Sequence, residues 1–155
     1  MITPVGGSGK VPAFVALLAP QKGMNVATLL DIQHSDRTQI EDLYRKKLLK
    51  KKQVATHAEL AGADEADVED MFDRNFYVGI VNAEFAKELN TPVDATALNA
   101  KEPRTLPAVE AWLAKNPFKS GAFGHYRPAR YFADNVATLW PQMSDAAGSK
   151  LRSST

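Results

Sequence analysis

Short apolar runs alternate with amphipathic stretches along the first half of the chain. The runs Ile2–Val5, Asn25–Leu30 and Gln53–Thr56 have the length of buried parallel strands. A helix from about Pro12 to Ala19 separates the first two runs, and "DRTQIEDLYRKKLLKKK" between the last two has apolar residues at helical spacing. This order predicts an α/β fold, with a small parallel sheet, right-handed crossovers and helices on both faces.

The second half of the chain is predicted to be helical. Helices are expected over Glu65–Phe72, Asn75–Lys87, Pro107–Lys115 and Arg127–Leu139. The intervening "LNTPVDATALNAKEPRTLP" is polar and contains prolines, which favours a surface loop. We therefore expect an α/β core over residues 1–90, a helical extension of the same domain over 91–140 and a flexible tail over 141–155.

Composition limits the classes of function. With 155 residues, 45% of them hydrophobic, the chain is long enough for one globular domain with a real core. A net charge of +1 excludes a global field that recruits nucleic acid or membrane, so any such binding has to be local. The absence of cysteine excludes disulfides and thiolate metal sites. The apolar run "FVALLAP" is too short to span a bilayer, and we expect a cytoplasmic protein without a membrane partner.

The glycine-rich stretch "TPVGGSGKV" raises the question of a phosphate-binding P-loop. That loop needs a glycine, four residues, then Gly-Lys and a hydroxyl side chain, because backbone amides wrap the phosphates and the hydroxyl holds magnesium. Pro4 stands at the position of the first glycine and Val11 at that of the hydroxyl. The sequence therefore favours a turn, Gly6–Gly9, between a strand and a helix.

Asp31 directly follows the predicted second strand. Ligands of an open parallel sheet bind at the carboxyl ends of its strands, which predicts that Asp31 and the Gly6–Gly9 turn lie close together. An aspartate beside a glycine turn can hold a metal and a phosphate. It can equally cap the following helix, so both readings stay open.

A second acidic group lies in "GADEADVEDMF", just after the third predicted strand. The dipole of a helix favours acids in its first turn, which explains Asp64 and Glu65. Glu69 and Asp70 lie beyond the first turn and are not explained in this way. They can reach the same edge of the sheet as Asp31.

Taken in order, these pieces resemble a known family. "TPVGGSGKV", a strand ending in "LLD", "IEDLYRKKLLKKK", "ADVEDMF" and "HYRPARYF" are similar to the topoisomerase-primase (Toprim) nuclease region of overcoming-lysogenization-defect (OLD) endonucleases. The resemblance implies a Toprim-like fold and two divalent ions, Mg²⁺ or Mn²⁺, that cleave a nucleic-acid backbone, with DNA as the expected partner. In that family an ATPase domain precedes the nuclease region.

The resemblance also implies roles for particular residues. Asp31 corresponds to the leading aspartate of the family's Asp-x-Asp motif, and Glu69 to a later metal ligand, with Asp67 and Asp70 as neighbours that could serve instead. Basic residues beside the scissile phosphate are implied at Lys119, His125 and Arg127. Such cations offset the charge that builds on the phosphoryl group, while the two ions activate water and stabilise the leaving oxygen.

Departures from the family pattern weaken the expected site. Gln33 takes the place of the second aspartate, and the glutamate of the preceding Toprim strand and the ATPase domain are missing. The chain is then a fragment, a subunit completed by an ATPase chain or by further copies of itself, or a degenerate remnant. We expect weak metal binding and two alternative functions, an incomplete nuclease or a non-catalytic module that binds DNA or a partner protein.

Overall fold

The computed structural model describes residues 8–18, 26–30, 37–46, 49–50 and 53–143. The chain forms two compact units, Met1–Ala66 and Asp67–Thr155. The predicted strand over residues 2–5, the first two residues of the glycine turn and Asp31 lie outside the described residues. The predicted α/β class is confirmed at this coarse level, because helices accompany a small parallel sheet.

The first unit contains the sheet. Its described elements, in chain order, are the 3-10 turn η1 (Ser8–Lys10), α1 (Val11–Leu18), β1 (Thr28–Leu30), α2 (Arg37–Arg45), β2 (Val54–Thr56) and α3 (His57–Ala61). β1 and β2 pair in parallel, with Leu29 opposite Ala55. The parallel pairing that the alternation of strand and helix predicts is therefore confirmed for these two strands.

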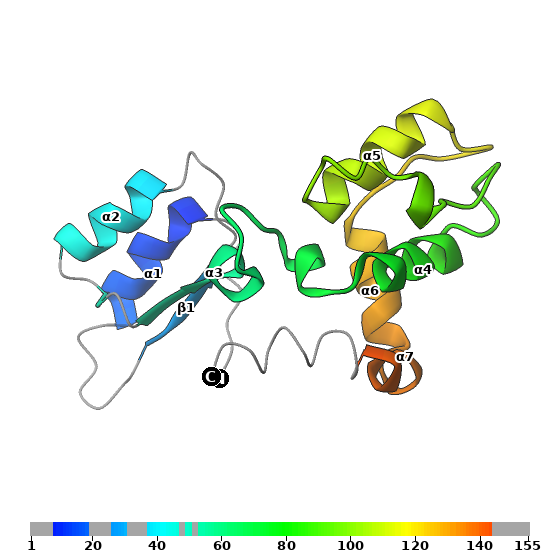
Figure 1. Cartoon of the computed structure of the whole chain (residues 1–155). Coiled ribbons are helices and arrows are strands. Elements are labelled where there is room, and N and C mark those ends of the chain that lie inside the picture. Colours follow the sequence, from blue (N-terminus) through cyan, green and yellow to red (C-terminus); the bar gives the residue numbers. More distant parts are fainter. Residues whose placement is uncertain (1–7, 19–25, 31–36, 47–48, 51–52, 144–155) are drawn as a thin grey trace. The chain divides into compact units, whose positions relative to one another are not determined.

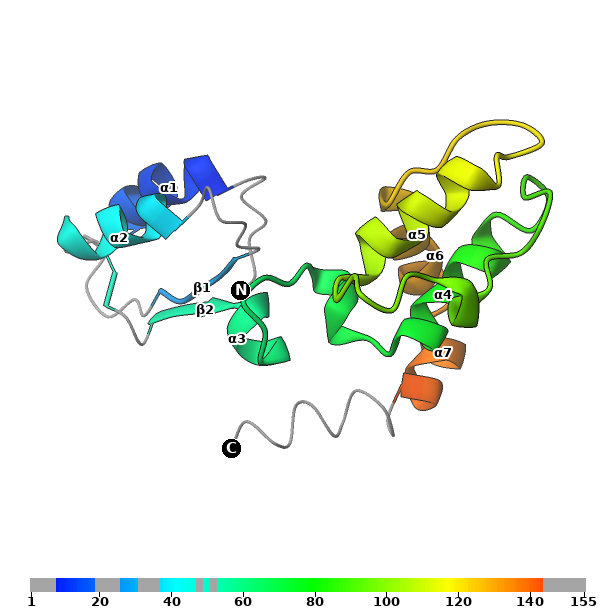
Figure 2. The same cartoon turned by 45° about the horizontal axis from the view of Figure 1, so that its top comes forward.

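One face of this sheet carries the core of the first unit. The core residues are Val11 and Val15 of α1, Leu30 of β1, Val54 of β2 and Leu49, with Val26 and Tyr44 packed against them. Helices α1 and α2 lie on the same side of the strands in both views (Figures 1 and 2). Leu29 points to the other face and is 55% exposed. Helices on both faces were predicted, whereas the described helices α1 and α2 cover one.

α2 ends earlier than predicted. The charge pattern suggested a helix continuing to Lys50–Lys52, but the helix ends at Arg45, where Lys46 N donates to Asp42 O at 2.9 Å. Gln53 then joins the turn to the sheet, because its Nε2 donates to Val26 O at 2.9 Å. Of the Lys-rich segment, Lys46 therefore lies directly after α2, and Lys50 is hydrogen-bonded to Gln53, which precedes β2.

The second unit is helical. Its described elements are η4 (Val68–Met71), α4 (Arg74–Glu84), η5 (Ala95–Ala97), α5 (Thr105–Lys115), α6 (Tyr126–Asp134) and α7 (Val136–Met143). Asp73 caps α4, since its Oδ1 accepts from Asn75 N at 2.8 Å and from Phe76 N at 3.3 Å. No helix in the described part of the chain is long and apolar enough to cross a membrane.

The core of this unit joins α4, α5 and the segment between them. Its buried residues are Tyr77, Val78, Val81 and Phe85 of α4, Ala108, Val109 and Leu113 of α5, and Leu89, Val93 and Leu98. The last three come from the stretch predicted as a surface loop. That stretch is irregular, as expected, but it is anchored: Asn82 Nδ2 donates to Val93 O at 2.9 Å, and Val93 N donates to Asn82 Oδ1 at 2.7 Å.

Two helix predictions in this unit are wrong in extent. The expected helix over Glu65–Phe72 is only the 3-10 turn η4, because the backbone is extended at Asp67 (φ −94°, ψ 170°) and at Phe72 (φ −93°, ψ 158°). The expected helix over Arg127–Leu139 is interrupted at Asn135, whose side chain donates to Tyr131 O at 2.8 Å. An asparagine side chain that bonds the backbone competes with helix continuation.

Candidate functional site

Asp67, a candidate metal ligand, forms an ion pair with Arg104. The Arg104 Nη2 and Nε atoms donate to Asp67 Oδ2 at 2.8 and 3.2 Å. Both side chains are largely buried, with 13% of Asp67 and 21% of Arg104 exposed. This carboxylate therefore holds η4 against the residue that precedes α5.

Asp70, the second candidate, is bonded to backbone amides. Its Oδ1 accepts from Thr105 N at 2.7 Å and its Oδ2 from Asp67 N at 3.0 Å. Thr105 is the first residue of α5, where backbone N–H groups lack a partner within the helix. Asp70 thus satisfies one donor at the start of α5 and one at the residue before η4, which is a structural role for its side chain.

Glu69, the third candidate, is buried beside the core of the second unit. Its charge acts on Tyr77, which is 3% exposed and whose hydroxyl has no hydrogen-bond partner among the described residues. Burial raises the pKa of the Tyr77 phenol, and the carboxylates of Glu69 and Glu110 raise it further. The phenol is therefore neutral at physiological pH.

A complete metal site is not visible in the described part of the chain. No three His, Asp or Glu side chains there are grouped so that they could hold a metal ion. Asp31, the leading ligand of the predicted site, lies outside the described residues. Binding of Mg²⁺ or Mn²⁺ therefore stays a prediction.

Arg127, predicted to lie near a phosphate, is held by two carboxylates of its own unit. Its Nε donates to Glu84 Oε1 at 2.7 Å, while Nη2 and Nη1 donate to the two Glu88 oxygens at 2.7 and 2.9 Å. The guanidinium also lies 4.2 Å from the centre of the Phe85 ring. These hydrogen bonds raise the pKa of Arg127 and lower that of Glu88. Arg127 therefore fastens α6 to the end of α4.

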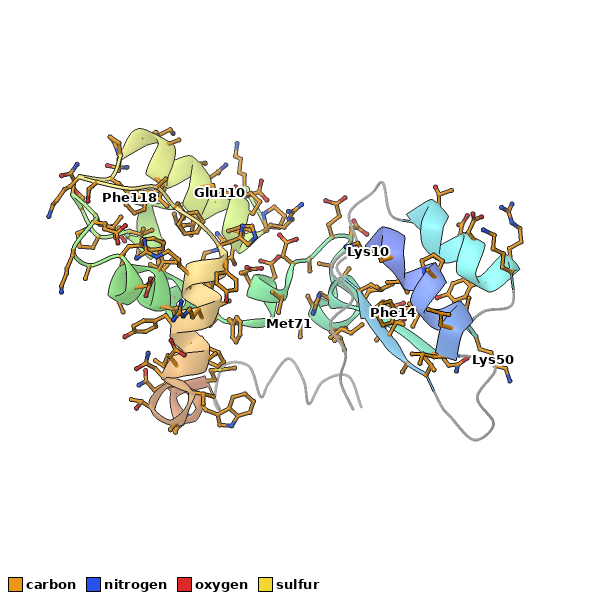
Figure 3. The ribbon with its side chains drawn as sticks, turned by 180° about the vertical axis from the view of Figure 1, so that it is seen from behind. Lys10, Phe14, Lys50, Met71, Glu110 and Phe118 are labelled. Carbon is orange, nitrogen blue, oxygen red and sulfur yellow. The ribbon has the colours of Figure 1, made fainter. Side chains whose placement is uncertain are left out.

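Glu88 also holds the segment between α5 and α6 in place. Lys119 N donates to Glu88 O at 2.7 Å. Gly121 has a φ of +74°, and a Cβ there would lie 3.0 Å from Glu88 Oε2. Phe118, whose position Figure 3 marks, packs its ring against Phe85 with the centroids 5.3 Å apart. Backbone and rings are thus fixed, whereas the Lys119 side chain is exposed.

The acidic and basic candidates of the second unit are not brought together. Asp70 lies just before α4, while Arg127 binds Glu84, the last residue of that helix. The 11 residues of α4 span about 16 Å at 1.5 Å per residue. Lys119 and His125 belong to the Arg127 end of the unit and are exposed. A single phosphate therefore cannot contact the whole predicted set within this unit.

The exposed side chains between the end of α5 and the middle of α6 include several cations, which the sequence analysis recognised only in part. No Asp or Glu occurs between Glu110 and Asp134. This stretch exposes the cations Lys115, Lys119 and Arg130, together with His125 and Tyr126. We call these five residues the α6 face. The absence of acidic residues from this stretch could be seen in the sequence. The exposure of Tyr126 could not, because it depends on the fold.

A second exposed cationic group lies in the first unit. Arg45, Lys46 and Lys50 are exposed at the end of α2 and in the turn after it. Asp42 pairs with Arg45 and, at 3.8 Å, with Lys46. Lys50 lies at the opposite end of this unit from Lys10 (Figure 3).

Comparison with known proteins adds no identification. No family model matches the chain, and no match to it was found among curated proteins or solved structures. The resemblance to OLD endonucleases is therefore an untested hypothesis, and function has to be argued from the contacts above.

The Arg127–Glu88 contact predicts a pH dependence of stability. The folded pKa of Glu88 lies below the ordinary value of 4.5, so its stabilising effect is present above that value and is lost as pH falls through the folded pKa. We expect Glu88→Gln to lower the melting temperature at pH 7 and to have a shrinking effect below pH 4.5. Thermal melts over this range check it. Asp134→Asn, at the exposed Arg130 pair, serves as control and should change little; an equal effect of Glu88→Gln at all pH values contradicts the prediction.

Proposed function

We propose that this protein binds nucleic acid without cleaving it, and that the α6 face makes the contact. The observation that carries the proposal is the set of exposed cations, Lys115, Lys119 and Arg130, in a stretch free of acidic residues. Phosphate contacts by Lys and Arg supply most of the affinity of non-specific nucleic-acid binding. The proposal takes the non-catalytic alternative of the two functions expected from the sequence.

The contacts of the acidic candidates support binding rather than cleavage. Two-metal cleavage needs carboxylates that are free to hold ions. Asp67 is engaged by Arg104 and Asp70 by two backbone amides. Arg127, which the nuclease hypothesis places beside the phosphate, donates to Glu84 and Glu88 instead. Its single positive charge balances one of these two carboxylates, which reduces but does not remove their repulsion of a phosphate backbone near the α6 face.

The exposed cations of α2 support the same partner. Arg45, Lys46 and Lys50 add a cationic group in the other unit. Both groups are local, as a chain of net charge +1 requires. The Toprim-like topology remains part of the proposal; the parallel pairing of β1 and β2, with α2 between them in sequence, is compatible with it.

Charge reversal on the α6 face tests the proposal. We expect Lys119→Glu/Arg130→Glu to weaken binding of a labelled DNA oligonucleotide about tenfold or more at low salt, because each reversal removes a phosphate contact and adds repulsion. Lys10→Glu/Lys101→Glu is the matched control, since it changes the net charge by the same amount and both lysines are exposed but lie outside the α6 face. Fluorescence anisotropy at several salt concentrations measures the effect. Absence of binding by the native chain, or equal effects of both variants, contradicts the proposal.

Plasmid nicking separates binding from cleavage. The chain is expected to leave plasmid DNA intact with Mg²⁺ or Mn²⁺ while binding it. Robust nicking that Glu69→Ala abolishes would instead establish the metal-dependent nuclease.

A further inference from the structure

Tyr126 is an exposed aromatic residue that the fold of the second unit does not use. It is the first residue of α6 and is 71% exposed. The same helix buries Pro128 and places the Phe132 ring 5.5 Å from Phe72. The core is therefore filled from the other side of α6, and Tyr126 is free to contact a ligand.

The position of Tyr126 is fixed by its neighbours. Arg127 holds the helix to Glu84 and Glu88, and Arg127 N donates to Gly124 O at 3.0 Å. Phe132, near the other end of α6, packs against the rings of both Phe72 and Phe76, with centroids 5.5 and 6.3 Å apart. The helix cannot rotate without breaking these contacts. The backbone of Tyr126 is thus held in place, and its side chain has only two χ angles to fix when a ligand stacks on it.

A cation accompanies this ring on the same side of α6. Arg130 follows Tyr126 by four residues, which places both on one face of the helix. Its side chain is 70% exposed, and its nearest acid, Asp134, is 3.6 Å away and also exposed. Lys119 and His125 add exposed polar groups from the residues before α6. An aromatic ring for a base and cations for the phosphates are the two parts of a single-strand binding surface.

We propose that the α6 face binds single-stranded nucleic acid, with an unpaired base stacked on Tyr126. This inference rests on the proposed function and adds the class of nucleic acid. The bases of a duplex are stacked on each other, so a ring on a helix surface reaches only their edges or the backbone, whereas the bases of a single strand present their faces. Cations alone do not make this distinction, because both forms carry phosphates.

The experiment compares Tyr126→Ala with Tyr126→Phe in the full chain. The probes are labelled oligo(dT) and oligo(U) of about 20 nucleotides, longer than most single-strand binding sites, and a duplex of the same length. We expect Tyr126→Ala to weaken binding of the single strands about tenfold and to leave duplex binding unchanged, because one stacked base is lost. Tyr126→Phe keeps the ring and should bind as the native chain does. Comparing oligo(dT) with oligo(U) shows whether DNA or RNA is preferred.

Trp140→Ala is the matched control, since Trp140 is an exposed aromatic of α7. Far-UV circular dichroism should be unchanged in every variant, because the substituted side chains are exposed. Single-strand affinity that survives Tyr126→Ala, or that Trp140→Ala lowers instead, overturns the stacking contact. If Lys119→Glu/Arg130→Glu weakens binding while Tyr126→Ala does not, the proposed function stands and this inference fails. If neither Lys119→Glu/Arg130→Glu nor Tyr126→Ala weakens binding, both the proposed function and this inference are contradicted, and a protein becomes the expected partner of the α6 face.

Discussion

Phe85→Ala is expected to lower the free energy of unfolding by about 3–5 kcal/mol, the usual cost of removing a fully buried phenylalanine ring. Phe85 is 0% exposed. Its ring lies 5.3 Å from that of Phe118 and 5.6 Å from that of Phe123, and Arg127 covers it at 4.2 Å. The substitution therefore leaves a cavity and also loosens the segment that carries the α6 face.

Urea unfolding followed by tryptophan fluorescence measures this loss, because Trp112 packs against the same core. Phe14→Ala is the control, since Phe14 of α1 is 37% exposed; its unfolding is followed by far-UV circular dichroism, because both tryptophans lie in the other unit. Its effect should be smaller, by about a third on buried area alone and by more because truncating a partly exposed ring leaves no closed cavity. Equal destabilisation by the two substitutions would contradict the assignment of Phe85 to the core. We also expect Phe85→Ala to weaken nucleic-acid binding, because the α6 face loses its support.

Arg104→Ala is expected to have the second largest effect, about 3 kcal/mol of lost stability. The substitution leaves the largely buried carboxylate of Asp67 without its cation, and an uncompensated buried charge is strongly destabilising. The double variant Asp67→Ala/Arg104→Ala removes both charges. It should be less destabilised than the sum of the two single variants, because their interaction is counted twice in that sum.

Denaturation with and without Mn²⁺ distinguishes this structural role from metal binding. If Asp67 chiefly pairs with Arg104, all three variants respond to Mn²⁺ as the native chain does. Two results together would restore Asp67 as a metal ligand. The stability losses of the two single variants would have to add up to that of the double variant, and a stabilisation by Mn²⁺ would have to disappear in Asp67→Ala. Calorimetry with Mn²⁺ on Asp31→Ala tests the remaining part of the predicted site. If this variant binds Mn²⁺ as weakly as the native chain does, the metal ligands lie elsewhere.

Local sequence patterns predicted several elements well. The helices expected at Asn75–Lys87 and Pro107–Lys115 correspond to α4 and α5, because their buried residues repeat every three or four positions, as Val78, Val81 and Phe85 do. The strand at Gln53–Thr56 corresponds to β2, whose residues alternate between the core and solvent. The spacing of buried residues within one helix or strand depends only on residues that are close together in the sequence, so the sequence alone reveals it.

The ends of helices could not be predicted from the spacing of apolar residues alone. The acidic residues of η4 read as a helix, but Asp67 and Asp70 bond Arg104 and Thr105, which lie 37 and 35 positions later. Asn135 ends α6 although the apolar spacing continues past it. In both cases side-chain hydrogen bonds compete with the helix, and helical periodicity does not register that competition.

By itself, the sequence determined the α/β class, the parallel order of β1 and β2, and the local character of any charged surface, since these follow from short-range patterns and composition. Only the tertiary structure decided what the charged residues do. Arg127 meets Glu84 and Glu88, 43 and 39 positions earlier, and is thereby removed from the set of cations available to a ligand. Tyr126, beside it, remains exposed because the core is already filled by Phe132 and Pro128. Contacts between distant positions set both outcomes, because a charge or a ring acquires its role from the partners that folding brings to it.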